Sequence, residues 1–446
     1  MNVWRLKKGS DQRLRSRHPW VFSNELMVSP KGILPGEPIE IQDVKGNFLA
    51  RGYGNPNSLI AFRALSFELK NLAPHSTTTV AEQIARAWTS RILRGCKNSF
   101  RICFSEADQL PGLVIDRYII KTAAENVQCL SVQITTAGMD RIFQDGEAIL
   151  KIATEKMFSE KLILHNWDKT IVVYKNSSSA RKMEGLAVQE AQVIRNPDSA
   201  NLIDACVLLQ NDADDFQLSL NCDILNGQKT GLFLDQSGNI EMVIQFLKKQ
   251  IKFKHKRKYK ILDLCCYMGQ WSAYLAELLL SAGHDVEVYL ADISDLALQK
   301  AEYNIKNIAV GLNKVNNLQV KAFKLDVMKI SDETKLELPE NNFDVVISDP
   351  PAFVKNKKVL ETGLHGYMKL NELAFKWATS DSLVVSCTCS GLVGMSEFKG
   401  ALRKSLLRSG KRAQIIGYGT QGIDHPQSVF IPEGEYLKMV VHHVLS

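Results

Sequence analysis

From Tyr259 onward, the sequence alternates between apolar, β-branched runs and segments with helical spacing. The apolar runs are KYKILDLCCYMG, VEVYLADIS, LQVKAFKLDV, FDVVISDPP and SLVVSCTCSG, and the helical segments include SAYLAELLLSAG and DLALQKAEYNIKN. Alternation at this spacing predicts a parallel, doubly wound α/β sheet with right-handed crossovers. Ligands of such sheets bind at the carboxyl ends of the strands, so reactive side chains are expected there.

The rest of the chain predicts two further domains. A chain of 446 residues with 45% hydrophobic residues is too long for one core and too apolar for a disordered scaffold. Residues 1–70 contain short apolar stretches broken by Gly and Pro, which predicts a small β-barrel. Residues 71–187 begin with helical spacing and continue as strands and a helix, which predicts a central α/β domain. The doubly wound domain then occupies residues 188–446.

Composition also narrows the class of protein. No segment approaches the roughly 20 apolar residues of a membrane span, and the first residues lack a secretory signal, so we expect a cytoplasmic protein without a membrane partner. The nine cysteines include no Cys-x-x-Cys pair, so neither a disulfide framework nor a metal site is expected. The oligomeric state, a homodimer included, is left open by the residue pattern.

Two runs of basic residues stand out against a net charge of +7. Met1 to Trp20 carries six basic residues and one acid, and Lys248 to Lys260 carries eight basic residues and no acid. Such runs bind nucleic-acid phosphates by counterion release, or they are solvated helix ends and loops. Either interpretation fits each run taken alone.

Acidic residues follow the first three strands of the predicted sheet. Asp263 and Gly269 lie around the first strand end, without the G-x-G-x-x-G spacing of a dinucleotide site. Asp292 closes the second strand, where it can accept from ribose hydroxyls or cap a helix, although Ser294 is better placed as the cap. Asp326 follows the third strand, as an acceptor for an adenine amino group or as an ordinary surface turn. Three acids without a phosphate loop favour a nucleoside ligand such as S-adenosylmethionine.

The fourth and fifth strands end in residues that suit methyl transfer to a pyrimidine. Asp349 begins a rigid Asp-Pro-Pro turn. Cys387 and Cys389 end the fifth strand, and a thiolate that adds to C6 of cytosine makes C5 nucleophilic. Alternation places both cysteines on the same side of the strand, and buried cysteines also suit a strand core. Cys389 is favoured because it is nearer the loop.

Seven motifs in order resemble the bacterial large-subunit ribosomal RNA cytosine-C5 methyltransferase family that carries an N-terminal PUA domain. They are RHPWVF (17–22), DQLPGLVIDRY (108–118), VQITTAGMD (132–140), GQKTGLFLDQ (227–236), DPPAFVKNK, SCTCSGL and HPQSVFIPEGEYLK (425–438). The resemblance implies a PUA β-barrel, a small α/β domain of the EEHEE type and a Rossmann-like class I methyltransferase domain. It further implies S-adenosylmethionine as methyl donor, a cytosine of 23S ribosomal RNA as acceptor and a covalent cysteine adduct.

The resemblance also implies roles for individual residues. The catalytic residues are Cys389 or Cys387 together with Asp349. The cofactor-binding residues are Asp263, Tyr267, Gly269, Asp292, Asp326 and Asp349. The RNA-binding residues are Arg13, Arg15, Arg17, His18 and Lys229.

The sequence departs from the family in the cofactor loop, where Tyr267-Met268-Gly269-Gln270 replaces the family's Tyr-Thr-Gly-Gly. Two other functions therefore stay open. A methyltransferase that acts on guanine N7 or N2 would also use Asp-Pro-Pro but would need no cysteine. An RNA-binding assembly factor that has lost turnover would tolerate Met268 and Gln270. Methylation of adenine N6 or glutamine is less favoured, because Ala352 follows Asp-Pro-Pro where an aromatic residue would stack the target.

Overall fold

The computed structural model describes residues 1–209, 218–227, 231–253, 257–329 and 342–445. These residues form two compact units. The first comprises Met1–Gln217, Cys222–Leu234 and Ile423–Gly434, and the second Leu218–Asn221, Asp235–Gly422 and Glu435–Ser446, in each case as far as they are described. Across the described helices, none combines the length and the apolar character that crossing a bilayer requires.

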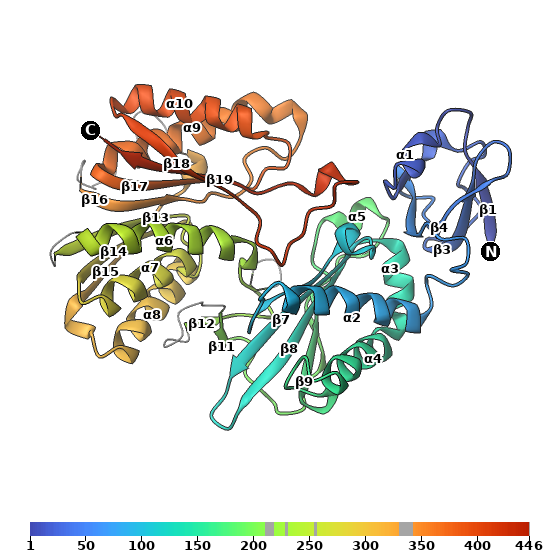
Figure 1. The fold of residues 1–446 in the computed structure, drawn as a ribbon, viewed down its shortest axis with the longest axis horizontal. Coiled ribbons are helices and arrows are strands. Elements are labelled where there is room, and N and C mark those ends of the chain that lie inside the picture. Colours follow the sequence, from blue (N-terminus) through green and yellow to red (C-terminus); the bar gives the residue numbers. More distant parts are fainter. Residues whose placement is uncertain (210–217, 228–230, 254–256, 330–341, 446) are drawn as a thin grey trace. The chain divides into compact units, whose positions relative to one another are not determined.

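The N-terminal part of the first unit is the predicted small β domain (Figure 1). Its five strands have the order β1-β3-β4-β5-β2, with β1 parallel to β3. Its elements are β1 (Asn2–Arg5), α1 (Gln12–Arg15), β2 (Trp20–Phe22), β3 (Glu37–Gln42), β4 (Phe48–Gly54) and β5 (Ile60–Ser66). Because side chains alternate along a strand, Ile39 and Ile41 both point into a core that also contains Phe62.

The central sheet of the first unit has the order β10-β9-β8-β7-β11, and β6 pairs with β7. Its elements are α2 (Thr77–Leu93), β6 (Phe100–Phe104), β7 (Leu113–Lys121), β8 (Asn126–Ile134), α3 (Ala137–Ile142), α4 (Gly146–Ser159), β9 (Thr170–Tyr174), α5 (Ala180–Met183), β10 (Gln192–Arg195) and β11 (Ala205–Leu208). Helix α2 begins where Ser76 Oγ accepts from Thr79 N, and its apolar face includes Ile84 and Trp88, as the helical spacing predicted. The sheet continues past residue 187, the boundary expected from the sequence, because β10 pairs with β9 and β11 with β7.

The second unit contains the predicted doubly wound sheet, with the order β15-β14-β13-β16-β17-β19-β18. Neighbours from β15 to β17 are parallel, and β19 and β18 add an antiparallel edge. The elements of this unit are α6 (Ser237–Phe253), β13 (Lys258–Leu264), α7 (Gln270–Ser281), β14 (Asp285–Asp292), α8 (Asp295–Gly311), β15 (Leu318–Lys324), β16 (Phe343–Ser348), α9 (Leu360–Trp377), β17 (Ala378–Thr388), α10 (Met395–Ser409), β18 (Ala413–Thr420) and β19 (Lys438–Val444). Strand β12 (Ser219–Cys222), all but the last residue of which is assigned to this unit, is not a strand of the doubly wound sheet.

Helices cover both faces of this sheet (Figure 1). Helices α7 and α8 pack together on one face, and α9 and α10 pack together on the other. From β13 the chain proceeds outward through β14 and β15, and it then returns to the other side of β13 with β16 and β17. The order of strands therefore reverses between β13 and β16, and this switch point is where ligands of such sheets bind.

Candidate active site

The four predicted acids gather at the switch point. Leu264 of β13 pairs with Ser348 of β16 and with Ala291 of β14, so the ends of these parallel strands share one edge. The charges of all four acids act on the thiol of Cys265. Its pKa is raised well above the usual value, first by desolvation and then by the charges of Asp292, Asp349, Asp263 and Asp326. The structure thus brings together residues that lie up to 86 positions apart in the sequence.

The loop between β13 and α7 has an unusual backbone. Cys265, Tyr267 and Gly269 have φ angles of 66°, 49° and 76°, in the left-handed region that non-glycine residues seldom adopt. Gly269 also approaches α8 closely, because a Cβ built on it would lie 3.1 Å from the Cβ of Ala301. Asn304 of α8 is buried and donates from Nδ2 to the carbonyl of Met268 at 3.0 Å. Packing against α8 therefore fixes the loop conformation.

Asp263 is a buried carboxyl group below this loop. Its Oδ2 accepts from Ser272 Oγ at 2.7 Å, while Oδ1 is buried and has no hydrogen-bond partner among the described residues. Burial is the main reason why the pKa of Asp263 rises to about 7, and the charges of Asp349 and Asp292 add to it. A cationic ligand at the site would lower this pKa and favour the carboxylate.

Asp292 and Asp326 occupy the ends of the next two strands. Asp292 accepts from the backbone N–H of Tyr267 at 2.9 Å and of Ser294 at 3.0 Å, so it helps to hold the loop. The helix-cap role belongs to Ser294, whose side chain accepts from Ala297 N. Asp326 lies two residues beyond β15 and 3.4 Å from the Nζ of Lys329.

Asp349 is positioned by two residues that the sequence did not single out. Its Oδ2 accepts from Gln236 Nε2 at 2.9 Å and from Trp271 Nε1 at 3.1 Å. Gln236 is in turn held by Asn239, whose Nδ2 donates to Gln236 Oε1 at 2.6 Å. Gln236 ends the motif GQKTGLFLDQ, and Trp271 is a polar-tipped aromatic residue at the start of a helix. These are the only signals that the sequence offered for their roles.

The two candidate thiols occupy different environments. Cys387 lies within β17 and is fully buried, and desolvation raises its pKa well above the usual value. Strand β17 ends at Thr388, so the strand alternation that placed Cys387 and Cys389 on one side stops before Cys389. Cys389 is partly exposed, with its Sγ 3.8 Å from the carbonyl oxygen of Pro350. The thiol of the partly exposed Cys389 therefore lies against the Asp-Pro-Pro turn.

The loops after β16 and β17 are tied together next to this thiol. Ser390 Oγ accepts from the backbone N–H of Val354 at 3.1 Å and lies 2.9 Å from the hydroxyl of Tyr367. The ring of Tyr367 stacks beside that of Phe353, with 4.6 Å between the ring centroids. Because these groups are buried, the position of the Asp-Pro-Pro turn relative to Cys389 is set by a shared polar network.

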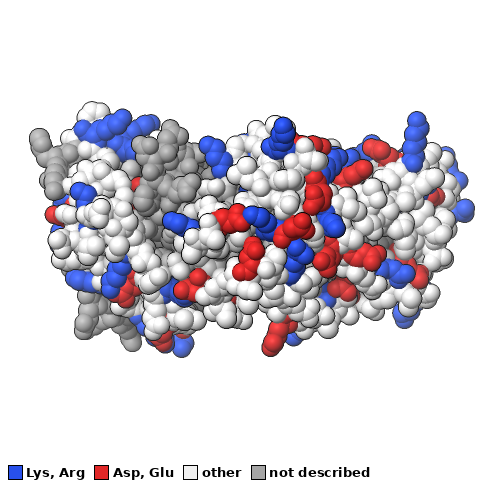
Figure 2. Space-filling view, turned by 90° about the horizontal axis from the view of Figure 1, so that it is seen from below, with Lys and Arg blue, Asp and Glu red and all other residues white. Residues whose placement is uncertain are grey.

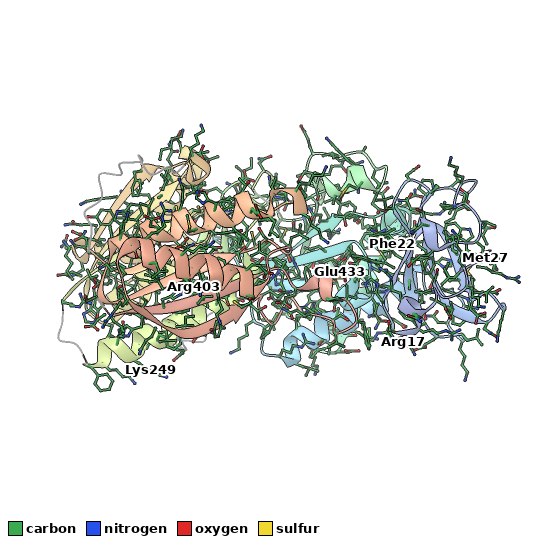
Figure 3. The ribbon with its side chains drawn as sticks, turned by 90° about the horizontal axis from the view of Figure 1, so that it is seen from above. Arg17, Phe22, Met27, Lys249, Arg403 and Glu433 are labelled. Atoms are coloured by element: carbon green, nitrogen blue, oxygen red, sulfur yellow. The ribbon has the colours of Figure 1, made fainter. Side chains whose placement is uncertain are left out.

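The predicted RNA-binding residues of the β domain differ in accessibility. Arg17 is exposed (Figure 3), and its guanidinium lies 5.2 Å from the ring of Phe67. Arg13 is partly exposed, lies 4.7 Å from the ring of Phe22 and pairs with Glu25 at 3.6 Å.

Two further predicted RNA-binding residues, Arg15 and His18, also have acidic partners. Arg15 forms ion pairs with Asp11 and Asp43. His18 is buried and its Nε2 lies 3.2 Å from Glu433 Oε2. Lys229 lies outside the described residues. On the face drawn in Figure 2, basic and acidic side chains are interspersed.

The expected cofactor, S-adenosylmethionine, fits the residues at the switch point. Gly269 precedes α7 without a side-chain cap, and the N–H of Ser272 in the first turn already donates to Asp263 Oδ2 at 3.3 Å. The N-terminus of α7 therefore favours a ligand carboxylate through the helix dipole. The four acids provide acceptors for an ammonium group and for ribose and adenine donors, and they favour a cationic sulfonium nearby. The buried Oδ1 of Asp263, which lacks a partner among the described residues, is one such acceptor.

Two family models match the chain. The model of the PUA-like domain matches residues 5–67, and the model of the FtsJ-like methyltransferase matches residues 244–414. The first covers the small β domain, and the second covers the switch point and most of the doubly wound sheet.

Curated relatives match over almost the full length. The chain is 30% identical over 440 residues to Ribosomal RNA large subunit methyltransferase I of Tolumonas auensis, with 98% of both chains covered. It is 31% identical over 437 residues to the protein of the same name from Aliivibrio fischeri strain ES114, with 97% of both covered.

Solved structures support the fold. A chain described as a SAM-dependent methyltransferase from Streptococcus mutans matches with a TM-score of 0.66 at 14% identity, over 99% of this chain and 100% of that one. A methyltransferase complexed with SAH matches with a TM-score of 0.67 at 15% identity and the same coverage.

Proposed function

The chain belongs to the ribosomal RNA large subunit methyltransferase I family, and from this we propose that it methylates C5 of a cytosine in large-subunit ribosomal RNA through a covalent Cys389 adduct. The enzyme is a SAM-dependent methyltransferase. S-adenosylmethionine, when bound, supplies an electrophilic methyl group. The remaining chemistry falls to the side chains of the protein.

The thiol of Cys389 carries the proposal. Methylation of a guanine nitrogen needs no thiol, because the nitrogen lone pair is itself nucleophilic, whereas cytosine C5 needs activation by a nucleophile at C6. Cys389 is partly exposed beside the carbonyl of Pro350, and the desolvated Cys387 is a poor candidate for the thiolate form.

In the proposed sequence, the thiolate of Cys389 forms a bond to C6 of cytosine, and the C5–C6 π electrons move to make C5 nucleophilic. After C5 has gained the methyl group, it loses its proton to a base. The electrons of the C5–H bond then re-form the C5=C6 double bond, and the Cys389 thiolate leaves C6. The thiolate is regenerated, as a catalyst must be.

Asp349 is proposed to orient the base. Its carboxylate is held by Gln236 and Trp271 on Oδ2, at the start of the turn that contacts Cys389. A carboxylate is a suitable acceptor for the 4-amino group of cytosine, which the base of uridine lacks. Asp263, Tyr267, Gly269, Asp292 and Asp326 are proposed to surround the cofactor.

The test compares Cys389→Ala with Cys387→Ala in the full-length protein. We expect Cys389→Ala to abolish methyl transfer to ribosomal RNA while the affinity for SAH is retained, and Cys387→Ala to keep most of the activity. With RNA that contains 5-fluorocytosine, the native chain and Cys387→Ala should form an adduct that survives denaturing electrophoresis, because fluorine at C5 blocks release of the thiolate.

Mass analysis of the product nucleosides separates the alternatives. Formation of 5-methylcytidine that depends on Cys389 supports the proposal. A methylguanosine product that Cys389→Ala still forms would contradict it and favour the guanine-nitrogen reaction. Absence of methyl transfer together with normal RNA binding would favour an assembly factor.

A further inference from the structure

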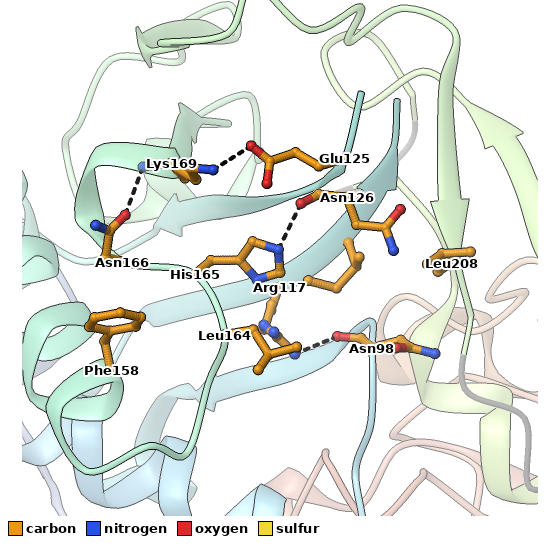
Figure 4. Close-up of a pocket in the computed structure, with 11 residues that line it drawn as sticks. Asn98, Arg117, Glu125, Asn126, Phe158, Leu164, His165, Asn166, Lys169 and Leu208 are labelled. Atoms are coloured by element: carbon orange, nitrogen blue, oxygen red, sulfur yellow. Dashed lines mark hydrogen bonds and ion pairs between the residues drawn. The ribbon is translucent and has the colours of Figure 1, made fainter. Parts of the chain in front are cut away.

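A pocket of about 530 Å³ opens in the central domain of the first unit (Figure 4), and none of the four acids of the candidate active site lines it. Arg117 of β7 lies at its base, Asn126 begins β8 beside it, and Asn98 precedes β6. Phe158 near the end of α4 and Lys169 before β9 complete the wall. We call this site the Arg117 pocket.

Arg117 differs from three other arginines of this domain that are buried or partly buried. Arg91, Arg101 and Arg181 each bind a carboxylate, of Asp108, Asp116 and Asp140 respectively, at distances of 2.6–2.9 Å. Arg117 is only 8% exposed, yet its hydrogen bonds go to neutral oxygens. Nε donates to Gln128 Oε1 at 2.7 Å, and Nη1 donates to the carbonyl of Asn98 at 2.9 Å.

The guanidinium of Arg117 is therefore poorly compensated. Among the described residues no carboxylate forms an ion pair with it, and Nη2 has no hydrogen-bond acceptor. Desolvation alone lowers its pKa to about 10. The rings of Trp88 and Phe100 lie 5.9 and 5.5 Å from Cζ, which compensates a charge less well than a carboxylate does. Burying a charge without a counterion is costly, so the site is suited to an external anion.

The surroundings of Arg117 match a nucleotide. The guanidinium fork suits the oxygens of a phosphate group. The Lys169–Glu125 ion pair and the amide side chains of Asn126 and Asn166 add polar groups at the wall. Phe158 is 40% exposed, and bases of single strands stack on such aromatic rings.

We propose that the Arg117 pocket binds a phosphodiester group of single-stranded RNA, with the adjoining base against Phe158. The choice of RNA over another phosphate carrier rests on the proposed function. The pocket would then be a second RNA contact, on the central domain rather than at the methyl-transfer site.

Leu164 provides a test that leaves the packing of the pocket intact, because it lines the pocket yet is 89% exposed. Leu164→Asp places a negative charge at the pocket, and Leu164→Lys a positive one. We expect Leu164→Asp to weaken binding of a labelled 12-nucleotide single-stranded RNA about fivefold at low salt, and Leu164→Lys to strengthen it by a similar factor. Leu72→Asp, at another exposed leucine of the first unit, is the matched control and should leave the affinity unchanged.

Arg117→Gln tests the guanidinium itself. The variant should make the salt dependence of RNA binding weaker. The negative slope of log K against log salt concentration should become smaller in magnitude by about 0.7, the contribution of one phosphate contact on a single strand. If Arg117→Gln does not fold, as judged by circular dichroism, the two Leu164 variants still test the proposal.

Equal RNA affinities of the native chain, Leu164→Asp and Leu164→Lys would overturn the proposal. So would binding of adenosine monophosphate that depends on residue 164 while RNA binding does not, since the pocket would then take a free nucleotide. All measurements can be repeated in the Cys389→Ala background. The Leu164 effects should persist there, so a failure of the cytosine-C5 proposal would leave this test unaffected.

Discussion

At the scale of single residues, Asp263 has the most unusual environment of the four acids. It is almost fully buried, its Oδ1 has no partner among the described residues, and desolvation raises its pKa to about 7. In the unfolded chain, the pKa of the same carboxyl group is near its ordinary value of 3.8. Between these two values the folded chain holds a proton that the unfolded chain has lost.

This difference predicts the sign of a pH effect on stability. Because the folded state binds more protons through Asp263, the free energy of unfolding should fall as pH rises from about 4 to about 7, by up to about 1.4 kcal/mol per unit. Asp263→Asn stays neutral and should lack this part of the decline. Urea unfolding at pH 4.5, 6 and 8 measures it, with Asp198→Asn, at an exposed position, as control. A difference between the native chain and Asp263→Asn that did not change with pH would contradict the assignment.

The strand-end residues could be predicted from sequence because each follows an apolar run. Their partners could not. Gln236 and Trp271 lie 113 and 78 positions before Asp349, and neither spacing nor periodicity reports hydrogen bonds between such distant segments. Similarly, alternation could not separate Cys387 from Cys389, because the distinction depends on β17 ending at Thr388.

At the scale of elements, the loop from Cys265 to Gly269 connects the sheet to α7 through three left-handed residues. It is held from both sides, by Asp292 at the backbone of Tyr267 and by Asn304 at the carbonyl of Met268. A loop fixed in this way presents the N-terminus of α7 in one orientation, which lowers the entropic cost of binding a ligand there.

A comparison of the two glycines at the ends of α7 distinguishes the effect of backbone strain from the effect of close packing. Gly269 and Gly283 have φ angles of 76° and 82°, but a Cβ on Gly269 would press against Ala301, whereas a Cβ on Gly283 meets no atom within 4 Å. Both alanine variants should lose about 1–2 kcal/mol of unfolding free energy to backbone strain. Gly269→Ala should lose about 1–3 kcal/mol more, and only it should weaken SAH binding in calorimetry. Equal losses in the two variants would show that the contact with α8 is unimportant.

The five parallel strands were predictable because their apolar runs are long and β-branched. The same reasoning missed β9, β10, β11, β18 and β19. Every residue of β10 and β18 is at least partly exposed, as in β15. However, β15 begins with alternating apolar and polar residues in LQVK, whereas QVIR and AQIIGYGT show no such alternation. Their place in the sheets depends on pairing with β9 and β19, which is a tertiary property.

At the scale of the whole molecule, the described residues of the predicted regions 1–70 and 71–187 lie in the same compact unit. Tyr53 of the β domain is 2% exposed and donates to the carbonyl of Pro111 at 2.8 Å, with its ring against Gly138. Such contacts join residues more than 50 positions apart, so composition and turn signals do not reveal them.

The carboxylate of Glu184 is the polar centre of this interface. It accepts from Asn55 Nδ2 at 2.8 Å and from Ser58 Oγ at 2.9 Å, and it forms an ion pair with Arg63 at 3.0 Å. Glu184 and Arg63 are both buried. Removing the carboxylate would leave the guanidinium with Glu106, at 3.7 Å, as its one counterion among the described residues.

Glu184→Met should therefore loosen the β domain while sparing the central sheet. Loss of one partner of a buried ion pair costs about 3–5 kcal/mol. The three side-chain donors to the carboxylate belong to the β domain, and its contact with the central domain is the backbone N–H of Ala137 at 3.3 Å. Hydrogen exchange followed by mass spectrometry should show faster exchange in β4 and β5, with β7 and β8 still protected. Glu190→Met, at an exposed position of the same segment, should leave both protected. Equal acceleration of exchange in all four strands would mean that the β domain and the central sheet open together as one cooperative unit. The reason is that losing a carboxylate which only anchors the β domain would leave the hydrogen exchange of β7 and β8 unchanged.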